Sequence, residues 1–173
     1  MIQIENNHPL QKENTFGFDI TASQYSVINS ETDLLLNIDQ QTAYKNGILV
    51  LGSGSNILFT KNPELWILKN NIKGITKIRE DENHIWLAVK GGEIWHEFVL
   101  YCVKNNYAGV ENLSLIPGTV GASPIQNIGA YGVEVCEVIE SVRFYHFDDG
   151  IFYEFTNREC EFGYRVSIFK QQF

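Results

Sequence analysis

Long apolar runs, clustered basic residues and paired cysteines are all missing from this 173-residue sequence. No segment approaches the roughly 20 apolar residues that a membrane-spanning helix needs. The N-terminal residues MIQIENN lack a basic region followed by an apolar core, so we expect no signal peptide. The 13 Lys and Arg residues are scattered and the formal net charge is -8, which disfavours a nucleic-acid surface. We therefore expect a cytoplasmic location, with no membrane and no nucleic acid among the partners.

Metal-ligating patterns are absent as well. The cysteines Cys102, Cys136 and Cys160 are odd in number and far apart, with no CxxC pair. Buried free thiols in a reducing compartment explain them better than a disulfide or a metal site. The four histidines also lack ligand spacing. We expect no metal.

The composition is that of a globular protein, with 44% hydrophobic and 20% charged residues. Apolar periodicity, capping signals and turn signals predict α+β elements in chain order. These are strands at 25–28, 48–51, 57–60, 65–68 and 84–89, helices from Ser30 to about Asn46 and at 94–105, and a hairpin at 138–147 and 151–155. We expect two small α/β halves, residues 1–72 and 73–173, joined without a long linker.

The first glycine-rich loop, Gly52-Ser53-Gly54-Ser55-Asn56, directly follows an apolar strand. Successive backbone N–H groups in a glycine-permitted turn bind anions, and serine hydroxyls add donors. The loop matches neither GxGxxG nor GxxxxGKS, so a Rossmann or P-loop site is not indicated. A plain tight turn between strands explains this motif equally well.

The second loop is the stretch IPGTVGASPIQNIGAYG at residues 116–132. Its glycines and amides are threaded through branched apolar residues, which favours backbone folded against a flat, polar-edged ligand over a flexible linker. The candidate contacts in this loop are Pro117, Gly118, Thr119, Val120, Gly121, Ser123, Gln126, Asn127, Ile128, Gly129, Ala130, Tyr131 and Gly132. Two such loops on two halves predict a nucleotide cofactor clamped between them.

Four motifs, GVENLSLIPGTVGASPIQNIGAYGVEV, LGSGSNILFT, NTFG and FGYRVSIFK, resemble the UDP-N-acetylenolpyruvoylglucosamine reductase family. This flavoenzyme family is also called UDP-N-acetylmuramate dehydrogenase. The match runs in order from about residue 14 to the end and looks like the family's first subclass.

The resemblance implies the two-part FAD-binding fold of the vanillyl-alcohol-oxidase (PCMH) type. FAD would be held non-covalently, with 52–56 at its pyrophosphate and 116–132 along it. NADPH would be the co-substrate, and a UDP-sugar would be reduced for peptidoglycan synthesis, hence for cell wall biogenesis, cell shape and cell division.

The same resemblance assigns catalytic roles to Arg165 and Tyr164. Hydride addition to an enolpyruvyl ether spreads negative charge into the carboxylate, and the planar guanidinium of Arg165 suits that group. Tyr164 matches a tyrosine on the substrate side. Val166 departs from the family, which usually has Asp there.

The family continues beyond the position of Phe173 with a further strand and a substrate-binding part that carries the proton-donating serine. We therefore expect a C-terminally truncated fold that is inactive alone. Two alternatives stay open: a nucleotide-binding module without chemistry, and another flavin oxidoreductase of the same fold superfamily.

Overall fold

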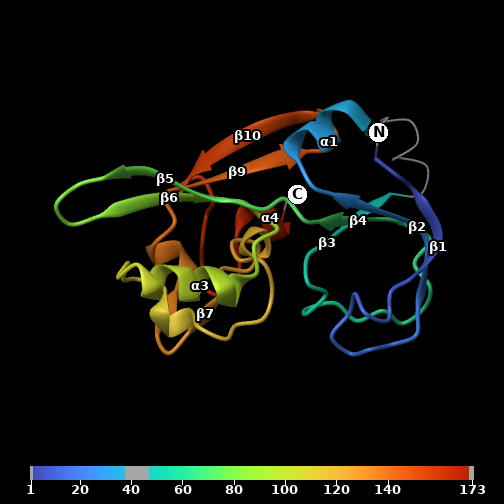
Figure 1. The fold of residues 1–173 in the computed structure, drawn as a ribbon, viewed down its shortest axis with the longest axis horizontal. Helices are drawn as coiled ribbons and strands as arrows, with labels where there is room; N and C mark the ends of the chain where they lie inside the picture. Colours follow the sequence, from blue (N-terminus) through green and yellow to red (C-terminus); the bar gives the residue numbers. More distant parts are fainter. Residues whose placement is uncertain (1, 38–46, 172–173) are drawn as a thin grey trace. The chain divides into compact units, whose positions relative to one another are not determined.

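The computed structural model describes residues 2–37 and 47–171, and two compact units divide the chain (Figure 1). Unit 1 is Met1–Lys73 and unit 2 is Gly74–Phe173. The later part of the helix predicted from Ser30, together with its end near Asn46, lies outside the described residues. Among the described residues, no helix has both the length and the apolarity to cross a bilayer.

Unit 1 is built on a four-stranded sheet with the order β1-β2-β4-β3. Strands β2 and β3 both run parallel to β4, which lies between them, and β1 is antiparallel to β2. The strands are β1 (Glu5–Pro9), β2 (Thr21–Ile28), β3 (Ile48–Leu51) and β4 (Trp66–Asn70). Their apolar side chains form a core with Leu10, Ala22, Tyr25, Leu51, Phe59 and Ile67.

Helix α1 (Glu31–Asn37) follows β2 and begins with the capping box that the sequence predicts. The Asp33 backbone N–H donates to Ser30 Oγ (3.2 Å), and the Ser30 N–H donates to Asp33 Oδ2 (2.9 Å). These bonds satisfy N–H groups that the first helical turn leaves open. The bond that Asp33 Oδ2 accepts from the Asn29 N–H (2.9 Å), more than the bonds with Ser30, holds the pKa of the Asp33 carboxyl below its usual range.

The strand predicted at residues 57–60 is wrong, because this segment is irregular and pairs with none of the strands in the described part of the chain. Phe59 is buried in the unit 1 core, whereas the neighbouring Leu58 is 60% exposed. The apolar run therefore anchors an irregular connection between β3 and β4. The buried Phe59 side chain and the partly buried Ile57 side chain, rather than a hydrogen-bonded ladder, hold the segment against the core.

Unit 2 packs helix α3 (Trp95–Lys104) against irregular backbone. Trp95, Val99 and Cys102 are buried at helical spacing, and Trp95 Nε1 donates to the Leu113 carbonyl (2.7 Å). The core continues through Val110, Leu113, Ile128 and Val135. Three short 3₁₀ helices and a last α-helix connect the rest: η1 (Glu111–Leu113), η2 (Val120–Ala122), η3 (Val135–Glu137) and α4 (Ile168–Gln171).

Three antiparallel pairs complete unit 2. They are β5 (Ile75–Glu80) with β6 (Ile85–Val89), β7 (Gly129–Ala130) with β8 (Val133–Glu134), and β9 (Ser141–His146) with β10 (Ile151–Thr156). The β9–β10 hairpin, orange in Figure 1, turns at the Asp-Asp-Gly that predicts it. The Gly150 N–H donates to the His146 carbonyl (2.9 Å), and Gly150 has a φ of 70°. Glycine tolerates that left-handed backbone without strain.

Candidate cofactor and substrate site

The loop Gly52–Asn56 leaves the end of β3 and folds onto a second turn of unit 1. Gly54 is buried with a φ of +66°, and a Cβ built on it would lie 1.9 Å from the Glu13 carbonyl oxygen. The Thr15 N–H donates to the Gly54 carbonyl (3.2 Å). Glycine is therefore required at position 54 by contact with the protein's own backbone, whatever the loop binds.

The supporting turn is held by Asn14, which the sequence reasoning did not single out. Its amide donates to the Leu10 carbonyl (2.8 Å) and accepts from the Phe18 N–H (3.1 Å), and the residue is 6% exposed. Asn14 and Thr15 belong to the NTFG motif, which the family resemblance includes but to which residue composition assigns no function. In the structure this motif supports the glycine loop, since the Thr15 N–H donates to the Gly54 carbonyl.

The backbone N–H groups of the same loop are free to donate to a ligand. Within residues 2–37 and 47–171, none of the five consecutive backbone N–H groups from Gly52 to Asn56 donates to another residue. The Ser53 hydroxyl donates to the Ser55 hydroxyl (3.3 Å), which leaves the Ser55 proton to point elsewhere. Successive N–H groups around a left-handed residue form the concave donor set that suits phosphate oxygens.

The loop 116–132 of unit 2 is, by contrast, tied down by its own backbone. The Val120 and Gly121 N–H groups donate to the Glu93 (2.8 Å) and Gly91 (2.9 Å) carbonyls, and the Trp95 N–H donates to Gly118 (3.1 Å). A Cβ on Gly121 would lie 2.9 Å from the Gly91 backbone. The loop is thus a rigid platform attached to the start of α3.

The residues of the loop 116–132 that are predicted to contact a ligand differ in their exposure to solvent. Thr119, Ser123 and Ile128 are buried, and the Ser123 hydroxyl donates to the Val120 carbonyl (2.8 Å). Tyr131 is 90% exposed with a left-handed φ of 54°. Pro117 is also exposed, whereas Gln126, Ala130 and Gly118 are half-buried. The accessible part of the loop therefore runs along its edge.

Asn127 corrects the expectation that its amide contacts a ligand. The residue is 0% exposed, and its amide nitrogen donates to Glu134 Oε2 (3.0 Å) and to the Gly163 carbonyl (3.1 Å). Its amide oxygen accepts from the Cys136 N–H (3.1 Å). A buried amide requires such partners. Asn127 satisfies both donors inside the protein and has no surface for a cofactor.

Tyr164 and Arg165 form the tip of a tight turn that lies against this loop. The Gly163 and Val166 backbones exchange two hydrogen bonds (3.0 and 3.2 Å), and Arg165 has a left-handed φ of 55°. Arg165 Nη2 donates to the Gly129 carbonyl (3.1 Å), and Tyr164 is 86% exposed. Unit 2 therefore brings Arg165 against the second glycine-rich loop at Gly129, 36 positions earlier in the sequence.

Val166, where the family resemblance leads us to expect Asp, is partly buried, and its backbone closes the turn by hydrogen bonds to Gly163. A Cβ on Gly163 would lie 3.0 Å from Val166 Cγ1. The turn is thus closed without a carboxylate at position 166.

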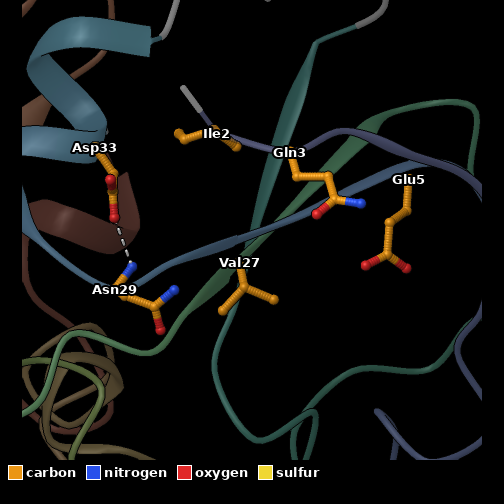
Figure 2. A pocket seen from close by; sticks show the side chains of 6 residues that line it. All are labelled: Ile2, Gln3, Glu5, Val27, Asn29 and Asp33. Carbon is orange, nitrogen blue, oxygen red and sulfur yellow. Dashed lines mark hydrogen bonds between the residues drawn. The ribbon is translucent and has the colours of Figure 1, made fainter.

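A separate hollow of about 320 Å³ lies in unit 1 beside the N-terminal segment. Figure 2 shows Gln3 and Glu5 at the start of the chain, Val27 from β2, Asn29 just after β2, and Asp33 from α1 around it. Its two carboxylates have protein partners: Asp33 accepts from the Asn29 N–H (2.9 Å), and Glu5 forms a hydrogen bond with His8 (2.7 Å). It contains none of the residues that the sequence predicts for a ligand.

Comparison with known proteins gives this architecture a family. Residues 24–156 match the FAD binding domain family. The UDP-N-acetylenolpyruvoylglucosamine reductase of Amoebophilus asiaticus is 50% identical over 169 residues, which is 98% of this chain and 50% of that protein. The reductase of Flavobacterium johnsoniae is 40% identical over 171 residues, with 99% and 50% covered. The chain spans about half the length of the curated relatives it matches.

Solved structures show the same fold. The UDP-N-acetylenolpyruvylglucosamine reductase of Thermus caldophilus superposes with a TM-score of 0.72 at 22% identity, covering 96% of this chain and 56% of that one. A solvent-stable cholesterol oxidase gives 0.56 at 13% identity, with 90% and 33% covered.

These neighbours define the α+β FAD-binding fold of the vanillyl-alcohol-oxidase type, as the sequence predicts. The chain belongs to the FAD binding domain family. Its relatives at 40–50% identity carry the reductase name, which confirms the resemblance drawn from the four motifs. The open donor set at 52–56 fits the anionic part of such a cofactor.

Proposed function

We propose that this chain is the FAD-binding part of an NADPH-dependent reductase acting in the cytoplasm. Its reaction would convert UDP-N-acetylenolpyruvoylglucosamine to UDP-N-acetylmuramate for peptidoglycan synthesis. The relatives named for this reaction support the proposal, since they match nearly the whole chain.

The observation that carries the cofactor assignment is the row of N–H groups from Gly52 to Asn56. These donors face no described protein acceptor, while the carbonyl of Gly54 is fixed from behind by Thr15. An anion placed against them gains several hydrogen bonds without ordering new backbone. The FAD pyrophosphate is the group that we assign to this loop, and the exposed edge of 116–132 would carry the rest.

Neither glycine-rich loop contains a cysteine or histidine, the residues that commonly tether a flavin, so we propose non-covalent binding. When bound, FAD supplies the two-electron chemistry that protein side chains lack.

In the proposed reaction, the guanidinium of Arg165 supplies the positive charge that binds the substrate carboxylate. One of its nitrogens, Nη2, donates to the Gly129 carbonyl, and within the described chain its other N–H groups meet no acceptor. A guanidinium oriented by one bond keeps its remaining donors for a substrate carboxylate. Negative charge grows on that carboxylate only as the double bond is reduced, so the interaction strengthens towards the transition state. Tyr164, exposed beside it, would contact the substrate.

Titration of the purified 173-residue chain with FAD and with riboflavin tests the cofactor assignment. We expect FAD to bind, with quenched flavin fluorescence, and to be released by denaturation. Ser53→Ala/Ser55→Ala should weaken FAD several-fold and leave riboflavin unchanged, because riboflavin has no phosphate. Ser23→Ala is the control, because it removes a serine hydroxyl of β2 that donates to the Glu64 carbonyl (3.2 Å), away from the loop 52–56. If FAD and riboflavin bind equally, or neither binds, the assignment of 52–56 fails.

A further inference from the structure

Asn127 stands where three segments of unit 2 meet. Its amide nitrogen joins β8, through Glu134, to the turn that carries Tyr164 and Arg165, through the Gly163 carbonyl. Its amide oxygen holds the Cys136 N–H at the start of η3. No other amide side chain in the described residues bonds Gly163.

The backbone of Asn127 is arranged for this task. Its φ of 46° lies in the left-handed region, which asparagine tolerates better than most residues. The residue is 0% exposed, so no water competes for these bonds. Both amide hydrogens are used on different segments, which fixes the plane of the amide.

The other supports of the turn at 163–166 come from side chains near its exposed tip and from its own backbone. Arg165 Nη2 donates to the Gly129 carbonyl (3.1 Å), and Lys170 Nζ donates to the Arg165 carbonyl (3.1 Å). The two internal hydrogen bonds join only Gly163 and Val166, and Arg165 holds a left-handed φ of 55°. The Ser167 hydroxyl donates to the Ile125 carbonyl (2.7 Å), which attaches the residue after the turn to the same loop. A left-handed arginine persists only where its surroundings hold it.

We propose that Asn127 is a positioning residue that fastens the Tyr164–Arg165 turn to the loop 116–132. This bond keeps the turn at a fixed position against the loop, so that Arg165 Nη2 remains within hydrogen-bond distance of the Gly129 carbonyl. The catalytic meaning of the bond rests on the function proposed above, whereas its effect on the turn does not.

Two substitutions separate the bond to Gly163 from the bond to Glu134. Asn127→Asp keeps the left-handed backbone and the acceptor for Cys136, but it places a carboxylate against the Gly163 carbonyl and the Glu134 carboxylate. Adding Glu134→Gln restores a hydrogen bond between positions 127 and 134 with donor and acceptor exchanged. The bond to Gly163 remains broken in the double variant.

Asn157→Ala is a matched control in the same unit. The Asn157 amide also bridges two carbonyls, those of Cys136 (2.7 Å) and Ile139 (2.8 Å), yet it does not touch the turn. It therefore reports the cost of losing an inward-facing amide by itself.

Amide hydrogen exchange of the 173-residue chain, followed residue by residue by NMR, measures the outcome. In Asn127→Asp/Glu134→Gln, the Gly163 and Val166 amides should exchange at least tenfold faster than in the original chain, while those of β9 and β10 keep their rates. Asn157→Ala should leave the turn amides unchanged. FAD affinity is recorded in parallel, so that absence of flavin binding to the original chain counts against the proposed function alone.

The proposal is overturned if the turn amides of the double variant exchange at the original rate. It is also overturned if they accelerate no more than those of β9 and β10, because Asn127 would then stabilise unit 2 as a whole.

Discussion

Gly54→Ala tests whether the phosphate-facing loop is shaped by contact with Glu13. The new Cβ would lie 1.9 Å from the Glu13 carbonyl oxygen, and real Cβ contacts begin near 3.0 Å, so one backbone must move by about 1.1 Å. Such a movement breaks the bond from the Thr15 N–H to the Gly54 carbonyl.

Gly17→Ala is the matched control, because both glycines have a φ of +66° and nothing lies within 4 Å of a Cβ at Gly17. The left-handed strain of an L-residue, about 1–2 kcal/mol, is therefore common to both variants. So is the loss of glycine's freedom in the unfolded chain. The lost hydrogen bond, about 0.5–1.5 kcal/mol, and the backbone shift apply to Gly54 alone. We expect Gly54→Ala to cost about 1–2 kcal/mol more than Gly17→Ala.

Urea unfolding followed by hydrogen exchange of β2 and β4 peptides gives this difference for unit 1. A single optical signal would not, because two compact units need not unfold together. Gly54→Ala should also weaken FAD, since its displaced loop no longer presents its donors, while Gly17→Ala should not. Equal destabilisation by the two variants would refute the close-approach argument.

Three further expectations follow from single side chains. In a longer protein carrying this segment with the remainder of the reductase, Arg165→Lys should slow substrate reduction about a hundredfold to a thousandfold, or about 3–4 kcal/mol, in stopped-flow experiments. Flavin reduction by NADPH should change little, and equal slowing of both steps would give Arg165 a structural role instead. Burial raises the pKa of the Cys102 and Cys160 thiols to about 11, so a thiol reagent at pH 8 should modify Cys136 first in the native chain. Burial, then the charges of Glu13 and Glu5, raises the pKa of Tyr25 to about 12. Because this folded pKa exceeds the unfolded value of 10.0, stability from Tyr25 is present below pH 10 and falls between pH 10 and 12. Tyr25→Phe should remove that loss in alkaline urea titrations, and an unchanged alkaline profile would contradict it.

The elements that the sequence predicts best are those whose signal is local. Helix α3 follows from the spacing of Trp95, Val99 and Cys102, and the β9–β10 hairpin follows from its Asp-Asp-Gly turn. Strands β1 and β5 are not predicted, because both carry mainly exposed polar or charged side chains. Edge strands of this kind show no apolar alternation to read.

The sequence predicts which residues form the candidate site, but it does not predict the contacts that hold them in place. The loops at 52–56 and 116–132 and the pair Tyr164–Arg165 are visible in the sequence, but their supports are not. The contact between Gly54 and Glu13 joins positions about 40 residues apart, and the bond from Asn127 to Gly163 joins positions 36 apart. No local propensity encodes such pairings, which only the packed backbone creates.

The glycines of the two loops show what composition alone cannot separate. Gly54, Gly121 and Gly129 are needed because a Cβ would meet backbone atoms of Glu13, Gly91 and Val133. Gly132, in contrast, has a φ of +81° with open space around it. A glycine-rich ligand loop is therefore partly a packing device, in which the close contacts fix the shape and the open positions remain for the ligand. It follows that a bulky residue at 129 would disturb the β7–β8 pair and, through the Gly129 carbonyl, the orientation of Arg165, so its effect on flavin and on substrate cannot be separated. A substitution at Gly132 meets no protein atom and adds only the strain of a left-handed L-residue, about 1–2 kcal/mol, so a loss of flavin affinity beyond that strain reports on the ligand.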